Sequence, residues 1–302
     1  MPWLVALLVT LILWDPPSAW AWGPTTHIQL GQSLLSTLSP GVGAMAGLLL
    51  RHARDFLYGN VAADVIQAKK FAQAKKHCHN WSVARGLMER ARDDHQRAFA
   101  MGYLCHLAAD CVAHNKFVPR QMTLSRSRTT FSHIYWEMRA DALATQQRWV
   151  EMRSVVTDHW PDHDELMEVE LTRPFFSFGF NKRLFTRVSL VSSARTWRRG
   201  VRLWQRVSRW PMSAQLLDDY LAECLSRMTS LLRLEADSPV MAEDPVGSVS
   251  FANVRVTRRL LRQMARSGIL RPEVLAEAVA HLGPSTWPGE ADPVIAVSPD
   301  SQ

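Results

Sequence analysis

The sequence predicts an all-α protein, a multi-helix bundle, because helical periodicity dominates the chain and strand signals are scarce. Apolar residues recur every three or four positions in several stretches, which is the spacing of one helix face. These stretches are residues 83–115, 131–156, 197–210, 214–234 and 254–264. The aromatic FFSFGF segment at 175–180 contains a glycine and is typical of a loop or a lid.

The amino terminus has the features of an export signal. Residues 4–13 form an apolar run that is too short to span a membrane, and Ala19-x-Ala21 is a small-x-small cleavage site. We therefore expect residues 1–21 to be a signal peptide, the mature chain to begin at Trp22, and the protein to be periplasmic or secreted. The segment before the run has no Lys or Arg, so an uncut membrane anchor is the alternative.

The remaining chain is expected to hold one large domain and two minor segments. We expect a helical domain over 22–235, a linker with a short helical appendage over 236–282, and a disordered tail over 283–302, which is rich in Pro, Ser and Asp. No later stretch is long and apolar enough for a transmembrane helix. The cysteines are too few for a disulfide scaffold, and we assign no bridge among Cys78, Cys105, Cys111 and Cys224.

Positive charge is concentrated in one part of the chain. The net charge is +7, yet residues 171–217 hold ten Lys and Arg and no Asp or Glu. Such a segment predicts an anionic partner, such as phosphate, lipid headgroups or nucleic acid. Within it lie the candidates for membrane or anion binding, which recur at helical spacing: Arg195, Arg198, Arg199, Arg202, Arg206, Arg209, Trp197 and Trp204.

These basic and aromatic residues predict an amphipathic helix. We expect the arginines to form one continuous stripe, and Trp197, Val201 and Trp204 to fill another face. A basic helix with tryptophan opposite is typical of one that lies in a headgroup layer, and the nearby FFSFGF segment favours lipid. Two alternatives remain open: contact with single-stranded nucleic acid, and a core-facing helix whose basic side is only solvated.

Side chains suited to zinc recur in short segments. His106, Asp110 and His114 are spaced four apart, so they share one face of a helix, and His133 and Glu137 have the same spacing. The neighbours of His106 and Asp110 are apolar, so this face is expected to be buried, and a buried carboxylate needs a compensating cation. Further residues of the same types are His27, Asp64, His77, His79 and Asp141.

The ordered set of ligands resembles the zinc-dependent phospholipase C family, which is related to the single-strand-specific secreted nucleases. The resemblance covers about residues 22–141 and consists of Trp22, His27, Asp64, His77 or His79, His106-x3-Asp110, His114 and His133-x3-Glu137. Two features depart from the family's pattern. His114 follows Asp110 by four residues rather than about six, and both His77 and His79 fit the spacing from Asp64, with His77 favoured by the family's pattern.

The resemblance implies up to three zinc ions in one cleft. One ion would be held by Asp64, His77 or His79, His106 and Asp110. A second would be held by the α-amine and carbonyl of Trp22 and by His27, with Asp110 bridging. A third would be held by His114, His133 and Glu137. The resemblance further implies that a metal-bound hydroxide attacks phosphorus, with Asp64 as the catalytic residue that orients or deprotonates the water.

The expected activity is that of a zinc-dependent phosphoric diester hydrolase of phospholipase C type. Its expected substrate is a phospholipid headgroup, met through peripheral contact with a membrane. The alternatives are a secreted zinc nuclease or nucleotidase, with nucleic acid as substrate, and a non-catalytic metal-binding module. No G-x-S-x-G nucleophile motif occurs in the sequence, and no protein partner is implied.

Overall fold

The computed structural model describes residues 22–39, 43–65, 78–126, 129–171, 177–208, 210 and 212–285, and all regular elements within them are helical. The predicted all-α class is therefore confirmed for this part of the chain. The expectations for residues 1–21, His77, Arg209, residues 286–302 and the side chain of Trp204 lie outside the described residues. None of the described helices is long and apolar enough to cross a membrane.

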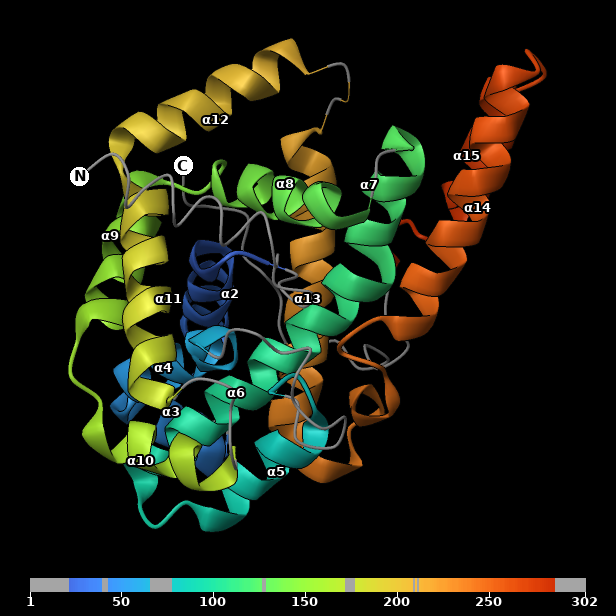
Figure 1. Ribbon diagram of the computed structural model, residues 1–302. Helices are drawn as coiled ribbons and strands as arrows, with labels where there is room; N and C mark the ends of the chain where they lie inside the picture. The colour runs from blue at the N-terminus through green and yellow to red at the C-terminus, as the bar shows by residue number, and fades with distance from the viewer. Residues whose placement is uncertain are drawn as a thin grey trace.

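Helix α6 (Asp94–Val112) is the central element of the fold (Figure 1). It is buried along nearly its whole length, with all residues from Ala98 to Val112 inside the core, as expected of a helix that is apolar on every side. Four helices pack around it: α2 (Pro24–Thr37), α4 (Ala53–Ala62), α5 (Trp81–Arg90) and α13 (Ala214–Leu234).

Two glycines allow α4 and α6 to pack closely. A Cβ atom added at Gly59 would lie 2.9 Å from the Cα of Gly102, and one added at Gly102 would lie 3.0 Å from the Cα of Gly59. Each added atom would also collide with a main-chain carbonyl of the facing helix, that of Phe99 or Phe56. Since backbone cannot move aside as a side chain can, this crossing requires glycine at both positions.

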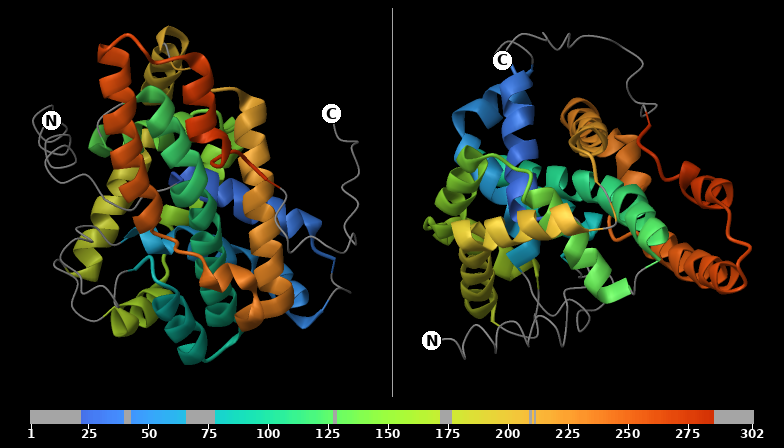
Figure 2. Two further views of the ribbon diagram at one scale, coloured as in Figure 1. Left: turned by 90° about the vertical axis from the view of Figure 1, so that its right-hand side faces the viewer. Right: turned by 90° about the horizontal axis from the view of Figure 1, so that it is seen from above.

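The remaining elements complete the bundle around this centre (Figure 2). They are α3 (Ala44–Arg51), η1 (Ala63–Val65), η4 (Ala113–Phe117), α7 (Val118–Ser125), α8 (Thr129–Asp141), α9 (Gln146–Thr157), α10 (Pro161–Glu170), α11 (Phe178–Ser193), α12 (Arg195–Val207), η5 (Glu235–Asp237), η6 (Pro239–Ala242), α14 (Ser248–Arg266) and α15 (Pro272–Ala280). Both α14 and α15 pack against α7. The four cysteines are buried and free.

Two long periodic stretches are each divided into two helices. The stretch 83–115 is split because the side chain of Asp93 accepts a hydrogen bond from the backbone N–H of Gln96 and so starts α6 afresh. The stretch 131–156 is split in the same way by Thr145, which caps α9. Apolar periodicity continues across such caps, so it does not reveal them.

The FFSFGF segment was expected to be a loop or a lid, but part of it is helical. Its second half, from Phe178, forms the first turn of α11, which Ser177 caps by accepting from the N–H of Phe180. Residues 172–176 lie outside the described residues. The segment expected as linker and appendage packs against the core, since Val240 and Val254 belong to the same buried cluster as α6. Of the expected tail, residues 283–285 are described, and the hydroxyl of Ser285 accepts from Lys116 at 2.6 Å.

Candidate metal centre

Asp110 lies at the centre of a buried cluster of imidazoles drawn from separate parts of the chain. Its Oδ2 is 3.0 Å from Nε2 of His79 and 3.2 Å from Nε2 of His106, and its Oδ1 is 3.3 Å from Nε2 of His27. His27 is carried by α2, His106 by α6, and His79 by the segment that leads into α5. All four side chains are at most 1 % exposed. The fold thus brings together residues that are up to 83 positions apart.

Asp64 adds a second carboxylate to this cluster. Its Oδ1 lies 3.4 Å from Nε2 of His79, and His27, Asp64 and His106 also place ligand atoms within 4.8 Å of one another. Ligands bound to one zinc at about 2.0–2.1 Å in a tetrahedron lie about 3.4 Å apart. The pairs around Asp110 and His79 span 3.0 to 3.4 Å, so the side chains are spaced as zinc ligands.

The protonation of His106 points to a cation between these groups. Its Nδ1 lies 2.8 Å from the carbonyl oxygen of Asn60, so this nitrogen carries the proton and donates. A neutral His106 then directs the Nε2 lone pair toward the carboxylate of Asp110, and two acceptors face each other in the core. Such contacts are costly when buried, and a shared cation removes the cost. Asn60 is also the partner that fixes the ring, a role that metal-bound histidines commonly need.

Unsatisfied polar atoms support the same conclusion. Within the described residues, neither ring nitrogen of His27 and neither carboxylate oxygen of Asp110 has a hydrogen-bond partner with acceptable geometry, although all four atoms are buried. Buried groups of this kind normally find partners. The close ion-pair distances without aligned hydrogen bonds are those of a coordination site, so the residues present fit zinc.

The electrostatics keep the cluster in the form that binds metal. Burial lowers the pKa of His27, and the neighbouring imidazole of His106 lowers it further, so the ring stays neutral. Burial alone would raise the pKa of Asp110, but the imidazoles of His106, His27 and His79 beside it hold it well below its usual range. Neutral imidazoles and an ionised carboxylate are the protonation states that coordinate a cation.

His114, His133 and Glu137 form a second group beside the first. His133 Nε2 lies 3.0 Å from Oε1 of Glu137, and the rings of His114 and His133 lie 5.3 Å apart between centroids. The ring of His79 is 6.4 Å from that of His114, so the two groups adjoin. The helices that carry them, α6 with η4 and α8, therefore present their candidate ligands to one region.

A π-helical turn accounts for the unusual position of His114 in the sequence. The element η4 continues α6 without a break, but its hydrogen bonds have π-helical spacing, and His114 lies within it. Such a turn is wider than an α-helical one and is often found at functional sites. His114 Nδ1 donates to the carbonyl oxygen of Pro245 at 2.6 Å, which directs Nε2 away from Pro245. A histidine only four residues after Asp110 can thus reach the second group.

Residues beyond the predicted domain contribute to this region. Pro245 lies between η6 and α14, and Phe251 of α14 has its ring centroid 5.7 Å from that of His114 and 5.2 Å from that of His133. A carbonyl oxygen and a phenyl ring carry no ligand signature in sequence. The C-terminal segment therefore supports the site. The sequence analysis did not predict this role for Pro245 and Phe251.

Trp22 is fixed next to the cluster by its side chain. The indole N–H donates to the carbonyl oxygen of Ala109 at 3.2 Å, and the ring stacks on Phe117 with centroids 4.6 Å apart. The side chain is fully buried. Since Ala109 directly precedes Asp110, these contacts hold the backbone of Trp22 close to the candidate ligands.

Asp141, at the end of α8, anchors the same terminal segment. Its carboxylate accepts hydrogen bonds from the N–H of Thr26 at 2.9 Å, the hydroxyl of Thr26 at 2.6 Å and the N–H of Thr25 at 3.3 Å. These are first-turn amides of α2, whose N-cap, Gly23, has no side chain to accept from them. Asp141 therefore caps α2 from another helix and holds His27 and Trp22 in position.

We expect Asp141→Ala to lower the free energy of unfolding by about 1–3 kcal/mol at pH 7, because the N–H of Thr25 and the hydroxyl of Thr26 lose their acceptor. Burial raises the pKa of Asp141 to about 6, against the hydrogen bonds from Thr26 and Thr25. The folded state then retains a proton that the unfolded chain releases, so stabilisation by Asp141 is greatest below about pH 4 and decreases as the pH rises to about 6. The difference from wild type should be larger at pH 5 than at pH 7.

Urea unfolding of zinc-free protein at both pH values measures this difference. Asp218→Ala is the matched control, because Asp218 is exposed on α13. Equal stability of the Asp141 variant and wild type at pH 5 would show that the carboxylate does not anchor α2.

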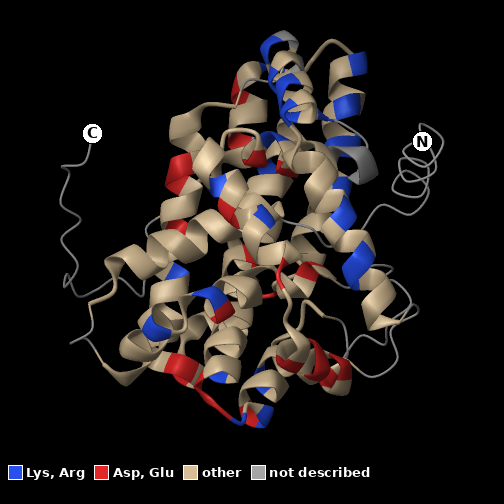
Figure 3. Cartoon of the chain, turned by 90° about the vertical axis from the view of Figure 1, so that its left-hand side faces the viewer, with Lys and Arg blue, Asp and Glu red and all other residues tan. Residues whose placement is uncertain are grey.

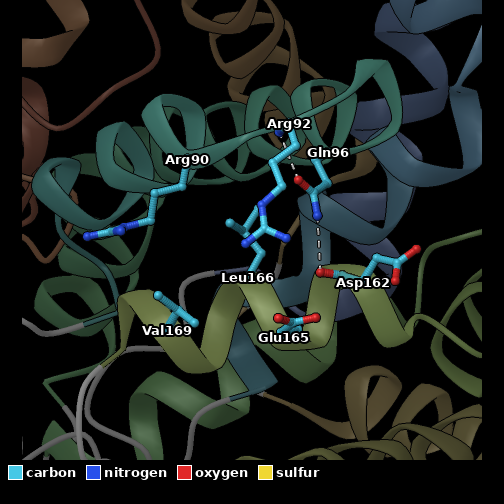
Figure 4. A pocket seen from close by; sticks show the side chains of 7 residues that line it. All are labelled: Arg90, Arg92, Gln96, Asp162, Glu165, Leu166 and Val169. Atoms are coloured by element: carbon cyan, nitrogen blue, oxygen red, sulfur yellow. Dashed lines mark hydrogen bonds between the residues drawn. The ribbon is translucent and has the colours of Figure 1, made fainter.

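A separate polar pocket lies far from the cluster, between α5, the start of α6 and α10 (Figure 4). It is lined by Arg90, Arg92, Gln96, Asp162, Glu165, Leu166 and Val169. Gln96 accepts from the backbone N–H of Arg92 and donates to the carbonyl oxygen of Asp162. These contacts hold the helix ends together, and the pocket contains none of the predicted site residues.

The predicted cationic helix is present as α12, but two residues lie elsewhere than expected. Arg198 is 5 % exposed, donates to Oε1 of Gln146 at 2.6 Å and covers the ring of Trp149, so it is a packing residue and not part of a solvent-facing stripe. Trp197 and Val201 were expected to fill one face together, but Trp197 is 41 % exposed, whereas Val201 is buried. The exposed arginines of α12 are Arg195, Arg199, Arg202 and Arg206.

Exposed apolar side chains accompany these arginines. Trp197 and Leu203 of α12 and Phe180, Leu190 and Val191 of α11 are all at least 39 % exposed. Helices α11 and α12 pack against each other, and the Lys and Arg residues of the chain are marked in blue in Figure 3. We call the four exposed arginines of α12 and these five apolar residues the basic surface.

Comparison with known proteins identifies one family. A family model described as zinc-dependent phospholipase C matches residues 26–177, half of the chain. The matched region contains every candidate ligand except Trp22, and it ends before α11. No curated protein and no solved structure matches the chain.

Proposed function

Because the chain belongs to the zinc-dependent phospholipase C family, we propose that it is an exported hydrolase that cleaves the phosphodiester bond of phospholipid headgroups. The family supports a zinc-dependent hydrolase with a phospholipid substrate. The observation that carries the proposal for this chain is the buried cluster at Asp110, where two carboxylates and three imidazoles are spaced as metal ligands.

Two groups of residues would hold the zinc ions. Asp64, His79, His106 and Asp110 would hold one ion, and His27, Trp22 and Asp110 would hold a second. His114, His133 and Glu137 would form a third. Bound zinc supplies Lewis acidity, which lowers the pKa of water to about 7 and polarises phosphoryl oxygens.

The protein's own groups orient the reactants around these sites. Asp64 is the candidate proton acceptor, since it adds a second carboxylate to the cluster, with Oδ1 3.4 Å from Nε2 of His79. Asn60 and Pro245 each hold a histidine ring by accepting from its Nδ1. Phe251 covers the rings of His114 and His133, which limits the access of water on that side. These contacts would fix the phosphodiester before reaction.

The mature chain is expected to begin at Trp22, because only a free α-amine and its carbonyl can chelate a metal at this position. The pKa of an α-amine is about 8, so deprotonation costs little at neutral pH. Amino-terminal sequencing of exported protein tests this expectation, with Trp22 as the predicted first residue. A precursor that keeps residues 1–21 should hydrolyse substrate much more slowly, and equal activity of precursor and mature protein would exclude the amine as a ligand.

The basic surface is the proposed contact with the membrane. Arginine beside exposed tryptophan and leucine is suited to an anionic headgroup layer, because the guanidinium groups bind phosphate while the apolar groups enter the interface. The same residue types suit single-stranded nucleic acid, which makes a zinc nuclease the second candidate function.

Replacing Arg199, Arg202 and Arg206 by glutamine is expected to weaken binding to phosphatidylglycerol vesicles by about 10- to 100-fold, since each cation near such a surface contributes about 1 kcal/mol. Vesicle co-sedimentation measures the effect. The matched control replaces three exposed arginines elsewhere: Arg85 of α5, Arg97 of α6, and Arg92, which lies between these helices. Hydrolysis of a soluble short-chain phospholipid should be unchanged in both variants. If the α12 and control variants bind vesicles equally, the basic surface is not the membrane contact.

A substrate panel tests the proposed activity. Mature, zinc-loaded protein is incubated with phosphatidylcholine, other phospholipids, single-stranded DNA and RNA, and nucleotides. We expect release of the phosphorylated headgroup from phospholipid at a rate well above those of the nucleic acids. Faster cleavage of single-stranded nucleic acid would favour the nuclease, and zinc binding without hydrolysis of any substrate would favour a non-catalytic module.

A further inference from the structure

A second cluster of histidine and carboxylate side chains lies outside the metal centre, where the amino-terminal ends of α4, α6 and α10 meet. His52, Asp55 and His95 each place a ligand atom within 4.8 Å of those of the other two. His52 directly precedes α4, Asp55 lies in its first turn, and His95 lies in the first turn of α6. None of these residues belongs to the group around Asp110.

The carboxylate of Asp55 is held in a fixed orientation. Its Oδ1 accepts from Nε2 of His163 at 2.7 Å, and His163 is 4 % exposed and stacks on Phe99 with centroids 4.6 Å apart. The other oxygen, Oδ2, faces Nδ1 of His95 at 3.2 Å and Nδ1 of His52 at 4.0 Å. A carboxylate anchored through one oxygen, with two imidazoles at the other, has the architecture of a supported metal ligand.

Hydrogen bonds join α4 and α6 to the start of α10 around this cluster. Gln96, next to His95, donates from Nε2 to the carbonyl oxygen of Asp162, next to His163, at 3.4 Å (Figure 4). Asp93, two residues before His95, caps α6. Since His163 also contacts Asp55, the ends of α4 and α6 are both tied to α10, and binding a cation would cost little ordering.

The ligand types and spacing suit zinc. Atoms bound to one zinc in a tetrahedron lie about 3.4 Å apart, and the two distances from Asp55 Oδ2 lie on either side of this value. Two imidazoles and one carboxylate are the protein ligands of zinc sites that keep one open position. The side chain of His95 is 62 % exposed, so the fourth position faces solvent.

We propose that His52, Asp55 and His95 form a peripheral zinc site, separate from the metal centre, that links the start of α4 to the start of α6. At their opposite ends, α4 leads directly into η1, which carries Asp64, and α6 carries His106. A cation at this site would therefore stabilise the packing on which the metal centre is built, without taking part in hydrolysis.

Zinc content under buffered free zinc tests the site directly. Mature wild type, His95→Ala, His52→Ala and the control His159→Ala are dialysed against a series of free Zn²⁺ concentrations, and bound zinc is counted per chain. His159 is exposed and lies outside the cluster. We expect wild type and His159→Ala to bind one more zinc than the two cluster variants, or to bind it at least about tenfold more tightly. Circular dichroism checks that all four proteins are folded.

A second comparison separates this site from the metal centre. In a background that carries both Asp110→Asn and His133→Ala, each of the three proposed sites of the metal centre lacks a ligand, so one zinc-binding step should remain, and His95→Ala should remove it. Added zinc should raise the Tm of this background protein but not that of the same protein with His95→Ala added. Identical zinc binding in wild type, His52→Ala and His95→Ala would overturn the proposal, as would a zinc-dependent rise in Tm that survives when His95→Ala is added to the background.

Discussion

Replacing Asp110 by asparagine is expected to lower kcat/KM for phospholipid hydrolysis by at least about 10³-fold, a loss of about 4 kcal/mol at the transition state. Asp110 contacts His27, His79 and His106, through both of its carboxylate oxygens. Removing its charge would leave two of the proposed zinc sites without their common ligand. The activity measurement is therefore made beside zinc content, which should fall as well.

Glu137→Gln is the matched comparison, and we expect it to retain more activity than Asp110→Asn. Glu137 contacts His133 at 3.0 Å and would serve only the third site, where His114 and His133 would remain as ligands. Both variants must be folded by circular dichroism. If Asp110→Asn keeps its zinc and most of its activity while Glu137→Gln is inactive, Asp110 does not bridge two ions.

Gly102→Ala is expected to destabilise the fold by about 3 kcal/mol or more, which is the upper range for overpacking a core. The added methyl group would meet the main chain of α4 at Phe56 and Gly59. The two helices would have to separate, although α4 carries Asn60 and leads to Asp64, and α6 carries His106 and Asp110. We therefore expect weaker zinc binding together with a lower Tm.

Gly200→Ala provides the contrast within the same chain. Gly200 lies inside α12, and a Cβ atom there would meet nothing within 4 Å. The substitution should be neutral or stabilise the protein by up to about 1 kcal/mol, since alanine favours helix. A similar loss of stability for both variants, measured by urea unfolding, would mean that the α4–α6 contact is not the cause.

Much of the fold and of the candidate site can be predicted from local spacing. The four-residue intervals from His106 to Asp110 and from His133 to Glu137 place ligands on one helix face whatever the tertiary structure. The bounds of α13 agree with the periodic stretch 214–234. Ser213 caps the start of the helix, and no cap inside the stretch divides it. The family resemblance adds the order of the ligands, and the match over residues 26–177 confirms that membership.

Other features depend on contacts between distant segments. Asp141 contacts Thr26, 115 residues away, and nothing in its own neighbourhood distinguishes it from a surface carboxylate. Pro245 and Asn60 act through backbone carbonyls, which every residue possesses. Arg198 belongs to the periodic basic stripe, yet its guanidinium lies over Trp149, because long cationic side chains can be buried along their stems.

The π-helical turn is another feature that residue spacing does not predict. From the sequence, His114 is one helical turn beyond Asp110, and an ideal α-helix would keep it in the same row of ligands. The wider turn at Ala113–Phe117 instead places its ring beside His133. Hydrogen-bond spacing within a helix depends on the packing around it, so spacing alone does not separate the two groups.

Anomalous diffraction at the zinc edge, from crystals of mature protein, tests the central claim most directly. We predict strong zinc peaks beside Asp110, among His27, Asp64, His79 and His106, and a further peak among His114, His133 and Glu137. The first residue in the electron density should be Trp22, with its amine at a peak. Zinc-loaded crystals without a peak beside Asp110 would contradict the account, because the cluster would then be held together by protons and not by metal.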